Sequence, residues 1–186
     1  MKDFEAQAAQ LLRGAYDLHT HTTPSHVNRA LDDFQLLQEA GKAGMAGVLI
    51  KSHYETTHAR AFIANCYGKS TATAYGAIVL NHPVGGLNPY AVENALDGGA
   101  RMVWMPTMDA TNCQHASMGA FYSHPGITVL EPSGRLKQGV YHIFALCKAH
   151  TVPLATGHVS VKEAVVLCEE GIAQGVTMIL THPEWP

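Results

Sequence analysis

The segment MAGVLIK, residues Met45–Lys51, decides the fold of this chain. It is a nearly continuous apolar run, which is typical of a parallel strand that is buried on both faces. Amphipathic helical patterns flank it over Phe34–Ala43 and Thr57–Tyr67, with Asp32 or Asp33 as the N-cap of the first helix. A strand between two helices indicates βαβ units and therefore a parallel sheet.

The same alternation continues along the rest of the chain. Apolar strands are predicted over Ala15–His19, Gly76–Asn81, Arg101–Pro106, Val152–Thr156 and Val176–Thr181. Helices are predicted over Asn88–Asp97, over Val140–His150 and from Ser160, with its capping-box partner Glu163, to Gly171 or Gly175; a small β-hairpin is predicted at Ile127–Leu136. A doubly wound sheet and a closed barrel both fit this α/β pattern. No GxGxxG motif or phosphate-binding P-loop supports a nucleotide-binding version.

Length and composition limit the class of protein. The 186 residues suit one domain, and 47% hydrophobic residues with only 15% charged residues indicate that much of the chain is buried. The net charge is -3 and no basic stripe is visible, so nucleic acid is not an expected partner. The cysteines lack CxxC spacing, the N-terminus lacks an apolar signal core, and no run is long enough to span a membrane. We therefore expect a cytoplasmic protein without a membrane partner.

Histidines follow the predicted strands. The chain has 12 histidines, and the first strand leads into His19 and His21, whose spacing places both imidazoles on one side of an extended backbone. In parallel α/β folds the ligand site lies at the carboxyl ends of the strands, and neutral imidazoles bind divalent metals. The pattern predicts a metal site at these ends, with the ligands His19, His21, His53, His158 and His182.

Each of these histidines has a structural alternative. The first-strand pair also fits two structural histidines at a strand end, and His53 fits a satisfied polar residue of the core. His158 follows Gly157, which allows a close backbone approach, but it also fits a residue that hydrogen-bonds at the next helix start. His182 precedes Pro183, which favours an extended backbone at His182, but it also fits a residue of a frayed C-terminal segment. The other histidines outside strand ends are expected on the surface or in loops: His26, His58, His115, His124, His142 and His150.

Three further polar residues at strand ends are predicted to serve catalysis. Lys51 ends the second strand and is expected to neutralise a carboxylate or a substrate anion. His82 follows the third strand as a metal or substrate contact, with a polar core residue as the alternative. Asp109 follows the fourth strand as a carboxylate candidate, and the alternative is a solvated loop residue.

The segment DLHTH, Asp17–His21, resembles the HxH signature on the first strand of the amidohydrolase superfamily and of the PHP-type phosphoesterases. In amidohydrolases further histidines end strands five and six, and His158 and His182 occupy those positions here. Essentially the whole chain is similar to a poorly characterised group of amidohydrolase-like TIM-barrel proteins, through the segments DLHTHTTPS, NHPVGGLNP, MPTMDA, ATGHVS and THPEWP. The resemblance implies a TIM-barrel-like (β/α) domain over residues 1–186 that hydrolyses an amide, lactone or ester-like bond with a metal-activated water.

The chain departs from this family at two places. Many amidohydrolases have a carboxylated lysine or a glutamate at the end of strand four, where this chain has Met105-Pro106-Thr107; Lys51 is not given that role. The family's aspartate ligand and general base ends strand eight, but this sequence ends at Pro186, after its sixth predicted strand. We therefore expect an incomplete barrel of about six βα units, because a full barrel needs about 200 residues or more. A fragment, closure by another subunit and an open partial barrel are the alternatives, and no general base is assigned.

Several functions fit these residues. The nitrogen-rich ligand set suits Zn²⁺, and Mn²⁺, Fe²⁺ or Ni²⁺ also fit. A PHP-like phosphoesterase is the first alternative, since Lys51-Ser52-His53 keeps only the histidine of that family's Thr-Asp-His element. A decarboxylase related to the amidohydrolases and an inactive, metal-binding barrel remnant that acts as a subunit or binding module are the others. We expect a small-molecule substrate, and self-association that covers the open sheet edges.

Overall fold

The structure, a computed structural model, describes residues 2–113 and 124–184. The chain divides into two compact units. Unit 1 contains Met1–Ser52 and Thr57–Ala77, and unit 2 contains His53–Thr56 and Ile78–Pro186. Each unit has its own parallel sheet and its own cluster of buried apolar side chains.

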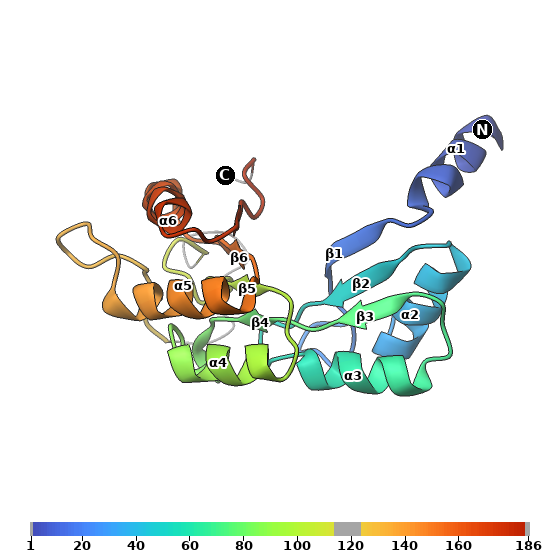
Figure 1. Cartoon of the computed structure of the whole chain (residues 1–186), viewed down its shortest axis with the longest axis horizontal. Coiled ribbons are helices and arrows are strands. Elements are labelled where there is room, and N and C mark those ends of the chain that lie inside the picture. Colours follow the sequence, from blue (N-terminus) through green and yellow to red (C-terminus); the bar gives the residue numbers. More distant parts are fainter. Residues whose placement is uncertain (1, 114–123, 185–186) are drawn as a thin grey trace. The chain divides into compact units, whose positions relative to one another are not determined.

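Unit 1 is built around a three-stranded parallel sheet in the order β1-β2-β3 (Figure 1). Gly47 at the start of β2 pairs with Tyr16 of β1 and with Thr73 of β3, which sets the register of the sheet. Helix α2 packs against β2, and α3 packs against β3. The elements of unit 1 are α1 (Lys2–Leu12), β1 (Tyr16–Thr20), α2 (Asp33–Lys42), β2 (Gly47–Ile50), α3 (His58–Tyr67) and β3 (Thr73–Tyr75).

The core of unit 1 lies between these helices and the central strand. All four residues of β2 are buried, which explains why the sequence is a continuous apolar run here. Leu37 and Ala40 of α2 are buried in one cluster with Ala61 and Ala64 of α3 and Ile50 of β2. This packing fixes the carboxyl ends of β1 and β2, after which His21 and Lys51 follow.

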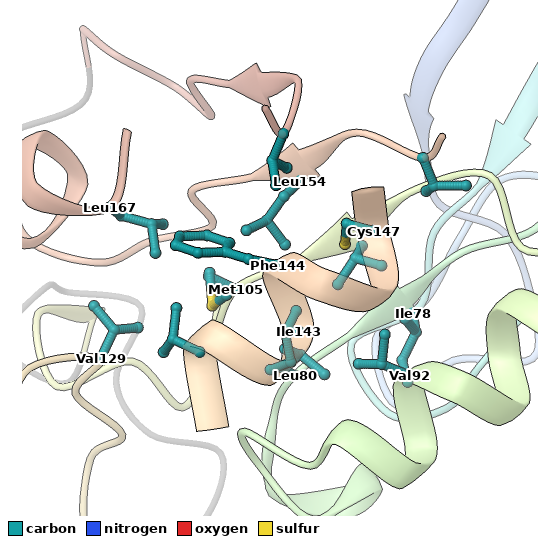
Figure 2. Close-up of a cluster of buried hydrophobic side chains, with 14 of the residues drawn as sticks. Ile78, Leu80, Val92, Met105, Val129, Ile143, Phe144, Cys147, Leu154 and Leu167 are labelled. Atoms are coloured by element: carbon teal, nitrogen blue, oxygen red, sulfur yellow. The ribbon is translucent and has the colours of Figure 1, made fainter. Parts of the chain in front are cut away.

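Unit 2 contains a four-stranded parallel sheet in the order β4-β5-β6-β7; Figure 1 labels the first three of these strands. Phe144 and Ile143 of α5 are fully buried with Leu154 of β6 and Leu167 of α6 in its main apolar cluster (Figure 2). The elements are β4 (Ile78–Val79), the 3-10 helix η1 (His82–Val84), α4 (Pro89–Asp97), β5 (Val103–Trp104), α5 (Gln138–His150), β6 (Leu154–Ala155), α6 (Val161–Ala173) and β7 (Met178–Ile179).

Two helices begin at the capping residues that the sequence indicates. Asp32 caps α2: its carboxylate accepts the backbone N–H of Gln35, whose side chain in turn accepts the N–H of Asp32. Ser160 and Glu163 form the same reciprocal pair at the start of α6. Each pair satisfies N–H groups that the first helical turn leaves without intrahelical partners. The predictions of these helix starts are confirmed.

The α/β class and the parallel pairing of the strands are also confirmed, whereas a closed barrel is not detected among the described residues. The six predicted strands are present: the first is shifted by one residue, to Tyr16–Thr20, and the other five are shorter than predicted. The predicted hairpin is reduced to one antiparallel bridge between Leu130 and Leu136. Helix α1 and strand β3 were not predicted. Residues 114–123, with the predicted loop residue His115, lie outside the described residues. Among the described helices, none has the length and apolar character needed to cross a bilayer.

Candidate functional site

The predicted site residues fall into two groups. His19, His21 and Lys51 belong to unit 1, where they lie at the ends of the paired strands β1 and β2. The second group belongs to unit 2 and consists of His53, His82, Asp109, His158 and His182.

In unit 1 the two histidines and the lysine contact one another directly. The imidazole centroids of His19 and His21 lie 5.5 Å apart, edge to face. The Nδ1–H of His21 donates to the backbone carbonyl of Lys51 over 2.8 Å. The Nζ atom of Lys51 lies 3.0 Å from Nε2 of His19. The strand pairing therefore assembles a nitrogen-rich group from residues that are about 30 positions apart in the chain.

Burial makes Lys51 and His21 unusually weakly basic. Lys51 is 1% exposed, and burial, followed by the positive charge of Arg29, lowers its pKa from 10.5 to about 7. Burial also lowers the pKa of His21 from 6.5 to about 3, helped by the charges of Lys51, Arg29 and His19 and opposed by its hydrogen bond to the Lys51 backbone. Desolvation disfavours the charged form of a base. His21 is therefore neutral at pH 7, which is the form that binds metals.

Asp17, which opens the HxH segment, acts on the backbone. Its carboxylate accepts the N–H of His19 over 3.0 Å. This bond lies at the irregularity in the β1–β2 register between Asp17 and Thr20. Asp17 thus supports the local strand geometry from which the two imidazoles project.

A buried ion pair holds the loop that follows His21. The guanidinium of Arg60, on α3, donates to both carboxylate oxygens of Asp33 over 2.8 Å. The same guanidinium donates to the hydroxyl of Thr22 and to the carbonyls of Thr23 and Pro24. The loop is thereby fixed to the starts of α2 and α3. Arg60 was not predicted as a site residue, because an arginine on a helix gives no sign in the sequence that it faces inward.

In unit 2 a buried amide organises the ends of the strands. Asn81 follows β4, and its Nδ2 donates to the carbonyl of His53 and to the hydroxyl of Thr107. Its Oδ1 accepts the backbone N–H groups of Thr107 and Asp109. The Nδ1 atom of His53 lies 2.7 Å from the same Thr107 hydroxyl. Asn81 thus joins three segments, and its position directly after a buried strand is the signal that could have identified it.

Three of the predicted ligands form a row of rings in unit 2. The ring centroids of His53 and His158 lie 6.2 Å apart, and those of His158 and His182 lie 5.6 Å apart. His53 and His158 are buried, whereas His182 is exposed. The extended backbone predicted for His182 is wrong, because its φ is +47°. The chain has left the ladder after Ile179 and turns here, and histidine is among the residues that tolerate this left-handed region.

His82 and Asp109 contact each other through the backbone. The Asp109 carboxylate, which is buried, accepts the N–H of His82 over 2.7 Å. The His82 ring donates from Nε2 to the carbonyl of Pro125 and packs against His124, with the centroids 5.3 Å apart. Asp109 therefore fixes the start of η1, and His82 connects it to the segment around Pro125.

The described residues contain no ready-made metal site. In residues 2–113 and 124–184, no three His, Cys, Asp or Glu side chains are grouped so that they could hold one ion. Unit 1 brings together the imidazole pair of His19 and His21, and unit 2 brings together the row of three rings. The predicted five-histidine set is thus divided between the units.

Comparison with protein families gives a match over most of the chain. No curated protein matches the chain. Residues 14–186 match the family that is described as "Family of unknown function (DUF6282)". This match begins just before β1 and includes both groups of site residues. Because it spans nearly the whole sequence, the chain belongs to the DUF6282 family.

Proposed function

We propose that this protein is a metal-dependent hydrolase of the amidohydrolase type that cleaves an amide, lactone or ester-like bond of a small molecule. For the fold we propose the TIM-barrel-like arrangement that the family resemblance implies, with one domain over residues 1–186. The HxH segment and its position at the end of the first strand suggest this chemistry, and the contacts in unit 1 support it.

The single observation that carries the proposal is the hydrogen bond from His21 to the Lys51 carbonyl. A carbonyl only accepts, so Nδ1 of His21 holds the proton and Nε2 holds the lone pair. Metal-binding histidines almost always donate their other ring N–H to a carbonyl, a carboxylate or water. The lowered pKa of His21 also keeps this ring neutral at pH 7. His21 therefore has the tautomer and the charge that a metal ligand needs.

A divalent ion, for which we propose Zn²⁺ with Mn²⁺, Fe²⁺ or Ni²⁺ as substitutes, would lower the pKa of its water to near 7 and polarise the substrate carbonyl. His19 and His21 supply two imidazole donors for it. Lys51, whose pKa is about 7, can present either a cation or a neutral amine beside His19. In this proposal Lys51 binds the anionic oxygen of the substrate.

The residues of unit 2 have supporting roles in the proposal. Asp109 is a positioning residue, since its carboxylate holds the backbone of His82. His82 is proposed to contact the substrate. His53, His158 and His182 stay predicted ligands, and metal content measured for each histidine variant tests them one by one.

The test is metal analysis of protein purified without chelators and loaded with zinc. We expect stoichiometric zinc in the wild type and its loss in His19→Asn and His21→Asn. His142→Asn is the matched control, because His142 is exposed on α5 and should leave the zinc content unchanged. Absence of stoichiometric transition metal in the folded wild type would contradict the proposal. We expect the protein to hydrolyse amides and lactones. Release of phosphate from simple phosphate esters, with no hydrolysis of amides or lactones, would favour a phosphoesterase instead.

A further inference from the structure

Helix α6 carries apolar side chains on two faces. Leu167 and Gly171, with Glu163 one turn earlier, are buried on the face that meets the core of unit 2. A second set lies on another face, where Val165 is 49% exposed and Ile172 is 65% exposed. A helix on the surface of a protein normally exposes a polar face opposite its apolar one. The second apolar face of α6 therefore indicates that something apolar binds there.

This second face forms one wall of a cavity. The cavity has a volume of about 580 Å³, and α6 lines it with residues one turn apart that include Val161, Ala164 and Val165. Met178 and Leu180, from the segment of β7, also line it. Small-molecule sites typically have volumes of about 300–1,000 Å³ and mostly apolar walls. Both properties match a small ligand.

Three polar residues of this cavity lie at the carboxyl ends of β6 and β7. Thr156 follows β6, and Thr181 and His182 follow β7. The two threonines are held in place, because the N–H of Thr181 donates to the hydroxyl of Thr156 and the N–H of Gly157 donates to the hydroxyl of Thr181. Ligand sites of parallel α/β folds lie at this edge of the sheet. The cavity thus has a polar end and an apolar body.

Charge narrows the class of ligand. Among the described residues that line the cavity there is no lysine or arginine, and Glu169 is the one carboxylate. An anionic ligand would meet a carboxylate and no compensating cation with a permanent charge. The body of the ligand is therefore not anionic, and its polar group is expected toward the threonines and His182.

We propose that this cavity binds the apolar part of a small carbonyl compound, a short alkyl chain or a single aromatic ring, with the carbonyl at the His182 end. The identification of this compound with the substrate rests on the proposed function, since His182 is a predicted ligand and its ring lies 5.6 Å from that of His158. The binding itself does not require metal or turnover. The cavity and the hydrolase can therefore be tested separately.

The experiment is a titration with straight-chain primary amides from acetamide to hexanamide and with phenylacetamide. Binding is followed by the ¹³C-methyl signal of Met178, which Met178→Leu identifies. Met102, Met105 and Met108 are buried and do not line the cavity, so their signals are internal references. We expect Met178 to shift saturably, with affinity rising about fourfold for each added methylene group. No shift of Met178 with hexanamide at millimolar concentration would overturn the inference.

Two variants on one helix provide the matched comparison. Val165→Trp fills the cavity and should weaken phenylacetamide binding at least about tenfold. Ala173→Trp places the same side chain at an exposed position of α6 outside the cavity lining and should leave the affinity unchanged. If Val165→Trp instead abolishes a concentration-dependent dimer and the amides do not bind, a second copy of the chain covers this face and the inference is overturned. Amide binding without any zinc or hydrolysis would support the cavity and contradict the proposed function alone.

Discussion

The Nζ atom of Lys51 lies 3.0 Å from Nε2 of His19, at the ends of two paired parallel strands. Two protonated nitrogens cannot share a hydrogen bond, so one of them has to accept. Burial of Lys51 lowers the pKa of its amine to about 7, which makes the neutral amine accessible near physiological pH. The Lys51 amine beside His19, the first histidine of the HxH segment, can therefore gain or lose its proton near physiological pH.

Replacement of Lys51 by methionine should stabilise the protein at neutral pH. The pKa of Lys51 is about 7 in the folded protein and 10.5 ordinarily. Between these values the unfolded chain binds a proton that the folded protein does not, so the free energy of unfolding rises with pH. The destabilisation caused by the buried lysine is therefore largest around and below pH 7 and declines toward pH 10.5. At about 1.4 kcal/mol for each pKa unit, we expect Lys51→Met to raise the free energy of unfolding by about 2–5 kcal/mol at pH 7.

Urea denaturation with a chelator present, at about pH 7 and about pH 10, checks this prediction. The advantage of Lys51→Met over the wild type should shrink markedly at the higher pH. Lys162→Met is the control, because Lys162 is exposed on α6, and its difference from the wild type should not change with pH. An advantage that is absent at pH 7, or equal at both pH values, would show that the buried amine is not desolvated.

Loss of the Arg60 guanidinium should destabilise unit 1. Arg60 is bound to both oxygens of Asp33 and to the loop after His21, and both side chains of the pair are mostly buried. Removing one partner leaves a buried charge without compensation. We expect Arg60→Met to lower the free energy of unfolding by about 3 kcal/mol, and Arg60→Lys by about 1–2 kcal/mol because an ammonium cannot form the two-pronged contact.

The matched control for Arg60 is the exposed pair of Lys42 and Glu39, which lie 2.7 Å apart on α2. Lys42→Met should cost less than about 0.5 kcal/mol, since exposed ion pairs contribute little. Denaturation curves measure all three variants. Because Thr22 directly follows His21, zinc affinity should also fall in Arg60→Met and stay unchanged in Lys42→Met. Equal costs for the two methionine variants would contradict the role of the buried pair.

Glu163 should make stability depend on pH in the acidic range. Burial of Glu163 raises its pKa, but hydrogen bonds from Thr128, Ser160 and the N–H of Val129 outweigh burial, and the net pKa lies below 4.5. A carboxylate with a lowered pKa stabilises the fold above its unfolded pKa, and this contribution is lost as the pH falls through the folded value. We expect Glu163→Gln to cost about 1–3 kcal/mol at pH 7 and progressively less below pH 4.5.

Thermal or urea unfolding across that pH range measures the effect. Glu169→Gln is the control on the same helix, because Glu169 is exposed, and its cost should be near zero at every pH. If the loss of unfolding free energy in Glu163→Gln stayed constant down to acidic pH, the glutamine amide would be destabilising for steric reasons, and the ionisation of Glu163 would be unimportant.

The elements that were predicted correctly are those that depend on residues close together in the sequence. The Asp32 and Ser160 caps and the buried run of β2 were read correctly, because side-chain caps and apolar periodicity depend on neighbours in the chain. Strand β3 was missed because it is only three residues long and exists through its pairing with Gly47 and its neighbours in β2. Helix α1 was missed, although Phe4, Ala8 and Leu11 recur at helical spacing; its side chains are mainly exposed in the structure.

In the candidate site, too, single residues could be predicted from the sequence, whereas contacts between distant segments could not. The histidines could be identified because a histidine at a strand end is visible in the sequence. The contact between Lys51 and His19, the amide of Asn81 and the guanidinium of Arg60 depend on which strands and helices are neighbours, over separations of about 30 residues. The backbone turn at His182 depends on where β7 ends, which apolar patterns locate only within a few residues.

Gly157 should tolerate no side chain, because it lies where the backbone before His158 passes close to another strand end. Its φ is +65°, and a Cβ atom would collide with the carbonyl oxygens of Met105 and Pro106. The N–H of His158 donates to the same Pro106 carbonyl over 2.9 Å, so the approach cannot widen without loss of that bond. We expect Gly157→Ala to lower the free energy of unfolding by at least about 3 kcal/mol, the sum of left-handed strain and steric displacement.

Gly134→Ala separates these two contributions. Gly134 also has a positive φ, +84°, but among the described residues no atom lies within 4 Å of a Cβ at this position. This variant should therefore cost only the strain, about 1–2 kcal/mol. Denaturation curves give both values, and the ¹³C-methyl signal of Met105 should shift in Gly157→Ala alone. Equal costs for the two variants would show that backbone strain accounts for the whole effect and that the passage beside Pro106 is wide enough for a methyl group.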